Sequence, residues 1–210
     1  MTDLFNALLL GIIEGITEFL PISSTGHLLI AERWLGHRSD LFNIGIQAGA
    51  ILAVVFIYRQ RLWELLAGFG KPSNRDYALK LGAAFGITAV LGIVVKKLGF
   101  ELPDEIAPIA WALILGGMWM VVAEHFAAKR AQALGERSTI SWTVAVLVGI
   151  AQVVAGVFPG TSRSAATIFV ALLAGTTNRA AATEFAFLVG IPTMFAATAY
   201  ELMDVVKSGQ

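Results

Sequence analysis

The sequence predicts an all-α, polytopic membrane protein with an inverted-topology repeat and two re-entrant broken-helix hairpins. Hydrophobic residues make up 57% of the 210 positions and charged residues only 14%, whereas soluble domains carry about a quarter charged residues. The mean hydropathy of +0.74 is typical of an integral membrane protein. Two apolar segments are also interrupted by proline, glycine and hydroxyl residues, near positions 21 and 159, and a simple spanning helix has no use for such breaks.

Composition excludes several classes of function. The formal net charge is zero, which argues against nucleic acid or a polybasic membrane patch as the main partner. The chain has no cysteine, and therefore no disulfide, no thiolate metal site and no thiol redox chemistry. The N-terminus lacks the basic region of a cleaved signal peptide, so we expect the first apolar segment to be retained.

The first hairpin is predicted from residues 4–20 and 27–35. Pro21 disfavours helical geometry at Leu20, and the hydroxyl residues before Gly26 favour a turn and a new helix start. Residues 27–35 are too short to cross a membrane alone, because a full crossing needs about 20 residues. We therefore expect two half-helices joined by a polar loop, which enter and leave on one side.

The rest of the chain is predicted to hold four crossings and a second hairpin. The crossings are residues 41–58, 81–95, 107–127 and 184–206, and residues 59–80 form a basic loop. The second hairpin lies before the last crossing, with an apolar half at 141–158, a break at 159–164 and a resumption at 165–175.

The two breaks align with each other at a constant offset. Identical pairs are Gly11/Gly149, Ile12/Ile150, Pro21/Pro159, Ser24/Ser162 and Ile30/Ile168. Three crossings separate the hairpins, an odd number, so the second hairpin should enter from the opposite face. We predict one membrane domain, residues 1–210, with repeat halves of about 1–98 and 107–210 whose broken helices meet near the midplane.

Basic residues predict the orientation of the chain. The loops at 59–80 and 129–137 place more lysine and arginine on one side than the other side carries. The richer side is predicted to be cytoplasmic, which puts both termini and the mouth of the first hairpin outside.

Glu14 and Glu18 are the candidate metal ligands. They lie four residues apart, so on a helix their side chains are adjacent. Two close carboxylates in a low-dielectric site cannot both ionise unless a cation compensates, which favours Mg²⁺ or Ca²⁺ bridging to phosphate. The alternative is that one glutamate is protonated or bonded to a neighbouring helix.

The residues after Pro21 are a candidate anion site. Ser23, Ser24, Thr25 and Gly26 precede a half-helix whose N-terminus offers free N–H groups and the positive end of a dipole. Simple N-capping needs only one hydroxyl, and here three are consecutive. His27, which Ser24 can approach, could act as a general acid, a base or a nucleophile toward phosphorus.

Arg163 is the strongest single candidate in the second break. Its planar guanidinium can donate two parallel hydrogen bonds to phosphate oxygens, which favours a role in phosphate binding. The alternative is a structural arginine whose charged end extends to the membrane interface. The neighbouring predicted binding residues are Gly160, Thr161, Ser162, Ser164 and Thr167. Together the two breaks supply the groups that handle a phosphate or diphosphate, and the apolar surroundings suggest that the other end of the substrate is lipid.

At these residues the chain resembles the undecaprenyl-diphosphate phosphatase family, the bacitracin-resistance phosphatases. The similarity is carried by Glu14–His27, Phe42–Arg61 and Pro159–Thr167 and runs over nearly the whole chain. It implies a divalent-cation-dependent enzyme of the bacterial inner membrane that hydrolyses C55 polyprenyl diphosphate to the monophosphate, which is recycled for cell-wall synthesis. It further implies lipid contacts and the possibility of a homodimer, and the orientation predicted from the basic residues opens the site to the periplasmic face.

The resemblance also implies a set of catalytic residues. These are Glu14, Glu18, Ser24, His27, Ser162, Arg163 and Thr167. The nucleophile stays open between Ser24 with His27 as base, His27 itself, and a metal-bound water. Family members continue past the last crossing with further hydrophobic helices, so this chain is expected to be shorter at its C-terminus.

A second hypothesis is a flippase or transporter for polyprenyl phosphate lipids, because inverted repeats with broken helices are transporter architecture. The phosphatase is favoured, since transport needs charge complementarity but neither a nucleophile nor a base.

Overall fold

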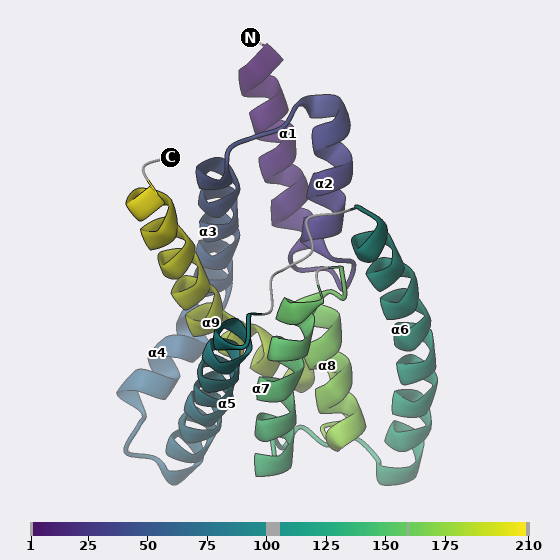
Figure 1. Ribbon diagram of the computed structural model, residues 1–210. Helices are drawn as coiled ribbons and strands as arrows, with labels where there is room; N and C mark the ends of the chain where they lie inside the picture. Colours follow the sequence, from purple (N-terminus) through teal and green to yellow (C-terminus); the bar gives the residue numbers. More distant parts are fainter. Residues whose placement is uncertain (1, 100–105, 159, 209–210) are drawn as a thin grey trace.

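The described part of the chain folds into helices and the short segments that join them. The computed structural model describes residues 2–99, 106–158 and 160–208, and these ranges contain no β-strand. The helices are α1 (Thr2–Thr17), α2 (Ser24–Leu35), α3 (Asp40–Ile57), α4 (Arg59–Ala67), α5 (Pro72–Lys97), α6 (Ile106–Leu134), α7 (Trp142–Val157), α8 (Arg163–Ala174) and α9 (Arg179–Ser208) (Figure 1). The predicted all-α fold class is confirmed.

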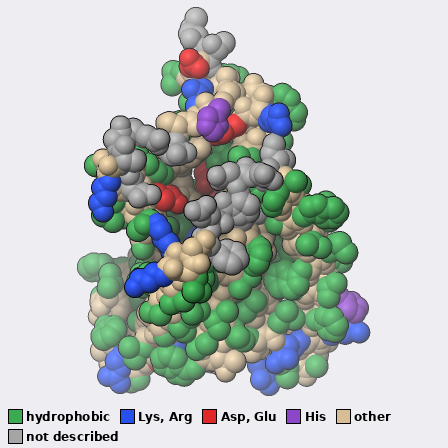
Figure 2. All heavy atoms as spheres, in the orientation of Figure 1, with side chains coloured by type: hydrophobic (Ala, Val, Ile, Leu, Met, Phe, Trp, Pro, Cys, Tyr) green, Lys and Arg blue, Asp and Glu red, His purple; other side chains and the backbone are tan. Residues whose placement is uncertain are grey.

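Several of these helices are long and apolar enough to cross a membrane. Three of them qualify within the described residues, α5, α6 and α9, and a fourth span results if α3 and α4 are counted together across their 64° bend. Large apolar side chains are exposed along the flanks of the molecule, as Figure 2 shows. Such a surface is stable in lipid rather than in water, so the fold is that of a multi-pass membrane protein.

The two predicted hairpins point toward each other. In Figure 1, α1 and α2 descend from the top of the molecule and α7 and α8 rise from the bottom, so that the two breaks face one another in the middle. A hydrogen bond joins them, since Ser164 Oγ donates to the Leu20 carbonyl at 3.0 Å. The opposite directions of the hairpins agree with the predicted inverted topology.

The breaks share one backbone geometry, but in a different register from the sequence alignment. α2 is capped by Ser23 at φ 63° and α8 by Ser162 at φ 54°, and these are the non-glycine residues with positive φ in the described chain. The alignment pairs Ser24 with Ser162, whereas the cap geometry makes Ser23 the equivalent residue, one position earlier. The other marker of the alignment, Pro159, lies outside the described residues.

The main core lies between α5, α7, α8 and α9. It is built from small and β-branched residues with one large aromatic side chain, including Ala84, Val144, Ala145, Val148, Phe185 and Val189. Gly149 makes the close approach of α7 to α5 possible, because a Cβ there would lie 2.7 Å from the Ala84 carbonyl oxygen. This packing supports the second hairpin from below its break.

Several predicted boundaries are wrong. Residues 59–80, predicted to be a basic loop, form α4 and the first two turns of α5, which begins at Pro72. Charged residues are typical of loops, which is why a loop was predicted. In the structure Arg61 Nε donates to Glu184 Oε1 at 3.0 Å, and Arg61 Cζ lies 4.8 Å from the centre of the Tyr77 ring. These contacts accommodate the charge of Arg61 in a helical segment. The last helix likewise begins at Arg179 rather than 184, where Arg179 donates to Glu124 of α6 at 3.0 Å.

Candidate active site

The loop between α1 and α2 places its serines by capping the second half-helix. α1 ends at Thr17, and Ser23 accepts a hydrogen bond from the Gly26 N–H at 3.4 Å. Gly26 packs against α6, because a Cβ there would lie 3.0 Å from Leu113 Cδ1. The N-terminal N–H groups of α2 are thereby held at the junction of the two hairpins.

The loop between α7 and α8 is built in the same way. Ser162 accepts from the Ala165 N–H at 3.4 Å and caps α8. Gly160 has φ +106°, and a Cβ at this position would lie 2.8 Å from the Ile109 carbonyl oxygen of α6. Only glycine fits both the backbone conformation and the contact, so both breaks are anchored on α6.

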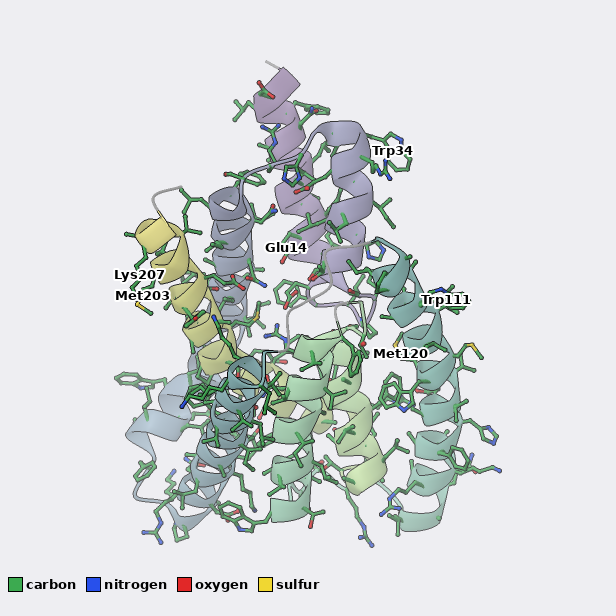
Figure 3. The ribbon with its side chains drawn as sticks, viewed as in Figure 1. Glu14, Trp34, Trp111, Met120, Met203 and Lys207 are labelled. Atoms are coloured by element: carbon green, nitrogen blue, oxygen red, sulfur yellow. The ribbon has the colours of Figure 1, made fainter. Side chains whose placement is uncertain are left out.

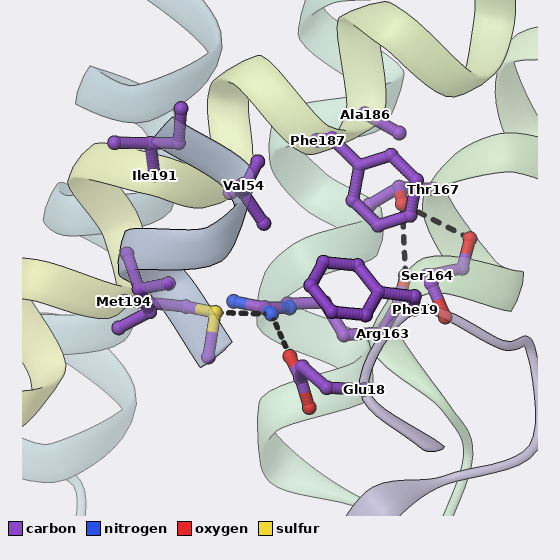
Figure 4. Close-up of a pocket in the computed structure, with 12 residues that line it drawn as sticks. Glu18, Phe19, Val54, Arg163, Ser164, Thr167, Ala186, Phe187, Ile191 and Met194 are labelled. Atoms are coloured by element: carbon purple, nitrogen blue, oxygen red, sulfur yellow. Dashed lines mark hydrogen bonds and ion pairs between the residues drawn. The ribbon is translucent and has the colours of Figure 1, made fainter. Parts of the chain in front are cut away.

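Glu18 and Arg163 form the centre of the site. The Arg163 guanidinium donates to Glu18 Oε1 across the junction of the hairpins and also contacts Met194 Sδ of α9 (Figure 4). Glu18 Oε2 accepts a second hydrogen bond from Ser24 Oγ at 2.6 Å. Both charged side chains are largely withdrawn from solvent, with exposed fractions of 11% for Glu18 and 27% for Arg163. One carboxylate therefore connects the serine of one break to the arginine of the other.

Two adjoining cavities meet at this ion pair. The polar cavity has a volume of about 380 Å³. Its lining includes most of the predicted site residues, namely Glu18, Ser23, Ser24, Thr25, Gly160, Ser162, Arg163 and Ser164. The second, apolar cavity shares Glu18 and Arg163 but is otherwise walled mainly by side chains such as Phe19, Phe187 and Ile191 (Figure 4). The polar cavity is large enough for an anionic group, whereas the apolar cavity, with a volume of about 20 Å³, holds little more than one water molecule.

Thr167 and Thr161 support the second break instead of facing the polar cavity. Thr167 is buried and donates to the Arg163 carbonyl at 2.8 Å, which ties down the first turn of α8. Thr161 packs against α6, where a Cβ on Gly116 would lie 3.6 Å from the Thr161 Cα. Thr167 also borders the apolar cavity, beside Arg163.

Glu14 lies deeper than Glu18. It is 2% exposed and points into the interior, whereas Trp34 and Trp111 point outward (Figure 3). Its Oε2 is buried and has no hydrogen-bond partner among the described residues. Glu14 lies within electrostatic reach of Glu18 and Arg163 but does not line the polar cavity.

His27 is not brought together with Ser24. Its Nδ1 donates to the Ser23 carbonyl at 2.8 Å, and its ring borders an apolar groove on the other side of the first hairpin, with Ile13 and Trp34. Ser24 gives its hydroxyl hydrogen to Glu18. The predicted approach of Ser24 to His27 is therefore not found, because the first turn of α2 directs the two side chains to different faces.

Comparison with known proteins identifies the family of the chain. A family model described as bacitracin resistance protein BacA matches residues 7–210. An undecaprenyl-diphosphatase of Rhizobium etli (strain CIAT 652) is 70% identical over 207 residues, which cover 99% of this chain and 77% of the relative. An undecaprenyl-diphosphatase of Xanthomonas euvesicatoria pv. vesicatoria (strain 85-10) is 64% identical over 209 residues, which cover 100% and 77%.

The chain belongs to the BacA family. The resemblance inferred from the two break motifs is confirmed. The matched region includes both hairpins, and with them the ion pair and the serines that cap α2 and α8.

The carboxylates of this BacA-family site fit a divalent cation only in part. Within the described residues, no group of three or more His, Asp or Glu side chains converges as a ready-made metal site. Glu14 does offer a buried oxygen without a donor, which is the acceptor that a hard cation needs. Mg²⁺ is commonly held by one or two carboxylates together with substrate phosphates, so the donor set fits a cation that arrives with the substrate.

Several residues at the polar cavity were not predicted from the sequence. Gln152 of α7 and Thr193 of α9 both line it, and Met194 contacts Arg163. Gln152 carries a signal that could have been used, because it is an isolated amide in the apolar run of α7. Met194 carries none, since a methionine in an apolar helix is expected anywhere in a core.

Proposed function

We propose that this chain is an undecaprenyl-diphosphatase of the bacterial inner membrane, which hydrolyses undecaprenyl diphosphate to undecaprenyl phosphate and inorganic phosphate. Family membership and the names of its relatives support the activity and its role in recycling the carrier lipid. The observation that carries the proposal is the Glu18–Arg163 pair, which joins the two hairpins where a polar and an apolar cavity meet.

Binding of the diphosphate is proposed to use the guanidinium and the two helix N-termini. Arg163 can hold two phosphate oxygens at once, and its charge stabilises the negative charge that develops at the terminal phosphoryl group. The capped N-termini of α2 and α8 add N–H donors from opposite sides. The polyprenyl chain is proposed to lie along the exposed apolar surface of the helices, because the apolar cavity beside Phe19 and Phe187, with a volume of about 20 Å³, is too small to hold it.

Glu18 is proposed as the base and Ser24 as the attacking hydroxyl. The 2.6 Å hydrogen bond already directs the Ser24 hydrogen at Glu18 Oε2, which is the geometry that proton removal requires. Ser24 Oγ forms a bond to the terminal phosphorus, and the bridging P–O bond breaks with its electron pair on the lipid monophosphate, to which Glu18 passes the Ser24 proton. Water then attacks the phosphorus of the Ser24 phosphoester, and the P–O bond to Ser24 Oγ breaks, which releases inorganic phosphate and restores the serine. His27 then acts through the loop, by holding the Ser23 carbonyl.

A divalent cation is proposed to complete the site. Glu14, through its free buried oxygen, and Glu18, once phosphate takes over Arg163, would hold Mg²⁺ or Ca²⁺. When bound, the cation supplies charge neutralisation at the phosphate oxygens. We further propose, from the distribution of basic residues, that the cavity opens to the periplasmic face. A homodimer stays a prediction from the family resemblance.

The flippase alternative is not favoured. It rests on the opposed hairpins, which serve either function. The hydrogen bond between Ser24 and Glu18 is a feature of hydrolysis that transport does not need.

Phosphate release from purified protein tests the proposal. Protein in detergent is incubated with C55 diphosphate, with Mg²⁺, with Ca²⁺ and with a chelator. We expect cation-dependent release in the wild type and loss of about 100-fold or more in Arg163→Ala. Arg75→Ala, which removes an exposed arginine at the start of α5, is the matched control and should retain activity. Absence of release from well-folded wild type that still binds the lipid would overturn the phosphatase in favour of the flippase.

A further inference from the structure

Gln152 is a buried side chain of the polar cavity that the mechanism above does not use. It lies on α7, is 3% exposed and lines the cavity together with Glu18 and Arg163. Its Oε1 is buried and has no hydrogen-bond partner among the residues that the structure describes. A buried amide oxygen without a donor is costly, so this oxygen is suited to a donor brought in by the contents of the cavity.

Thr88 of α5 fixes which end of the Gln152 amide is free. Thr88 Oγ1 lies 2.9 Å from the Ala84 carbonyl, 3.0 Å from the Gly149 carbonyl and 3.1 Å from Gln152 Nε2. The hydroxyl has one hydrogen, which it donates to the two carbonyl oxygens. Its third neighbour must therefore be a donor, and that is the amide nitrogen. A flipped amide would place three acceptors around one hydrogen, so Oε1 is the end left without a partner.

The close contact of α5 and α7 makes this arrangement rigid. Gly149 approaches Ala84 so closely that any side chain at position 149 would meet backbone. Thr88 bonds to carbonyls of both helices, and it is itself 8% exposed. The orientation of the Gln152 amide is thus set by backbone atoms rather than by mobile side chains.

The chemistry of Oε1 differs from that of the groups around it. Arg163, the capping serines and the helix N-termini offer donors, which suit phosphate oxygens. Oε1 is only an acceptor and would repel those oxygens. Of the species that hydrolysis requires, water is the one with two O–H hydrogens. One hydrogen is transferred to the base during attack, and the other can donate to Gln152 Oε1.

We propose that Gln152 is a positioning residue for the hydrolytic water, held in place by Thr88. The inference rests on the proposed phosphatase activity. The water oxygen forms a bond to the phosphorus of the Ser24 phosphoester, and the bond from phosphorus to Ser24 Oγ breaks with its electron pair on that oxygen. Glu18, which has by then passed the Ser24 proton to the departing lipid phosphate, takes one water proton and returns it to Ser24 Oγ. The other water proton, directed by Gln152 Oε1 during attack, stays on the released phosphate.

The test uses methanol as a nucleophile that competes with water. Methanol has one O–H hydrogen, which the base takes, so methanol cannot also donate a hydrogen bond to Gln152. In water–methanol mixtures, wild-type protein should discriminate against methanol, and the ratio of methyl phosphate to inorganic phosphate measures this preference. Gln152→Met, which keeps the length of the side chain without the amide, should raise that ratio several-fold. It should lower kcat about 10-fold, as expected for a lost hydrogen bond of about 1.4 kcal/mol, and leave KM within about two-fold.

Thr88 variants separate positioning from folding. Thr88→Val removes the hydroxyl and should shift the product ratio in the same direction as Gln152→Met, whereas Thr88→Ser keeps the hydroxyl and should restore the wild-type ratio. Gln60→Met, on the exposed face of α4, is the matched control.

Three outcomes would overturn the inference. The first is an unchanged product ratio in Gln152→Met with a lower melting temperature, which makes the residue structural. The second is an unchanged ratio with a raised cation concentration for half-maximal activity and weaker Mg²⁺ binding by calorimetry, which makes it a cation ligand. The third is a Thr88→Val protein that behaves as wild type. Absence of phosphate release from the wild type would instead contradict the proposed phosphatase itself.

Discussion

At the scale of single residues, Glu18 is the side chain that connects the site. It lies directly after the end of α1 and accepts from Ser24 in its own loop and from Arg163 in the opposite one. One carboxylate therefore connects the loops of both hairpins. In the mechanism that we propose, phosphate binding at Arg163 weakens one of the two interactions, and Glu18 then takes the proton of Ser24.

Removal of the Ser24 hydroxyl should abolish most activity. Ser24→Ala is expected to lower kcat by about 100-fold or more, because it deletes the hydroxyl that donates to Glu18, and to leave the fold intact. The measurement is phosphate release at saturating C55 diphosphate. Ser39→Ala removes the serine that caps α3 outside the site, and should cost roughly 1 kcal/mol of stability without loss of kcat. Near-normal turnover of Ser24→Ala would exclude Ser24 as the attacking group.

At the scale of elements, glycines decide how closely the helices approach. Gly149 sets the contact between α7 and α5, and Gly26 and Gly160 let the two breaks pack on α6. The site therefore depends on helix packing at positions that carry no chemistry themselves.

Gly149→Ala should destabilise the protein. A Cβ at 2.7 Å from the Ala84 carbonyl oxygen forces α5 and α7 apart, and overpacking of this kind costs roughly 1–3 kcal/mol. The measurement is the thermal melting of purified protein. Gly92→Ala in α5 has nothing within 4 Å of the added Cβ, and its melting temperature should be unchanged or higher. Equal melting temperatures for the two variants would contradict the close packing of α5 and α7.

The sequence predicts the elements correctly where helix-breaking residues mark their ends. Proline, glycine and consecutive hydroxyl residues mark both breaks, and the hairpins are found at the predicted positions. The loop predicted at residues 59–80 from their charge is wrong. Arg61 pairs with Glu184, which is distant in the sequence, and a local sequence pattern does not contain this tertiary contact. Helical spacing also makes Glu14 and Glu18 neighbours, yet only Glu18 lines the cavity, since α1 ends at Thr17 between them.

At the scale of the whole molecule, the opposed hairpins place a polar cavity inside an apolar protein. The flanks expose large hydrophobic side chains (Figure 2). The cavity walls carry carboxylate, guanidinium and hydroxyl groups. We propose that this arrangement receives a charged headgroup at the junction of the hairpins while its hydrocarbon chain stays beside apolar residues.

The orientation of the chain can be measured by cysteine labelling, because the sequence contains no cysteine. His37→Cys, at an exposed position between α2 and α3, should react with a membrane-impermeant thiol reagent added to the outer face of the inner membrane. Arg75→Cys, at the start of α5, should react only after the membrane is opened. The reverse pattern would show that the cavity opens to the cytoplasm.

The most direct test of the central claim is a double-mutant cycle between Glu18 and Arg163. Glu18→Gln, Arg163→Ala and the double variant are compared by kcat/KM for C55 diphosphate, with folding checked by melting temperature. If the two hairpins form one catalytic unit, each single variant loses about 100-fold or more and the double variant loses little beyond the worse single one. Losses that multiply in the double variant would show that the two residues act independently, and would contradict a shared site at the junction of the hairpins.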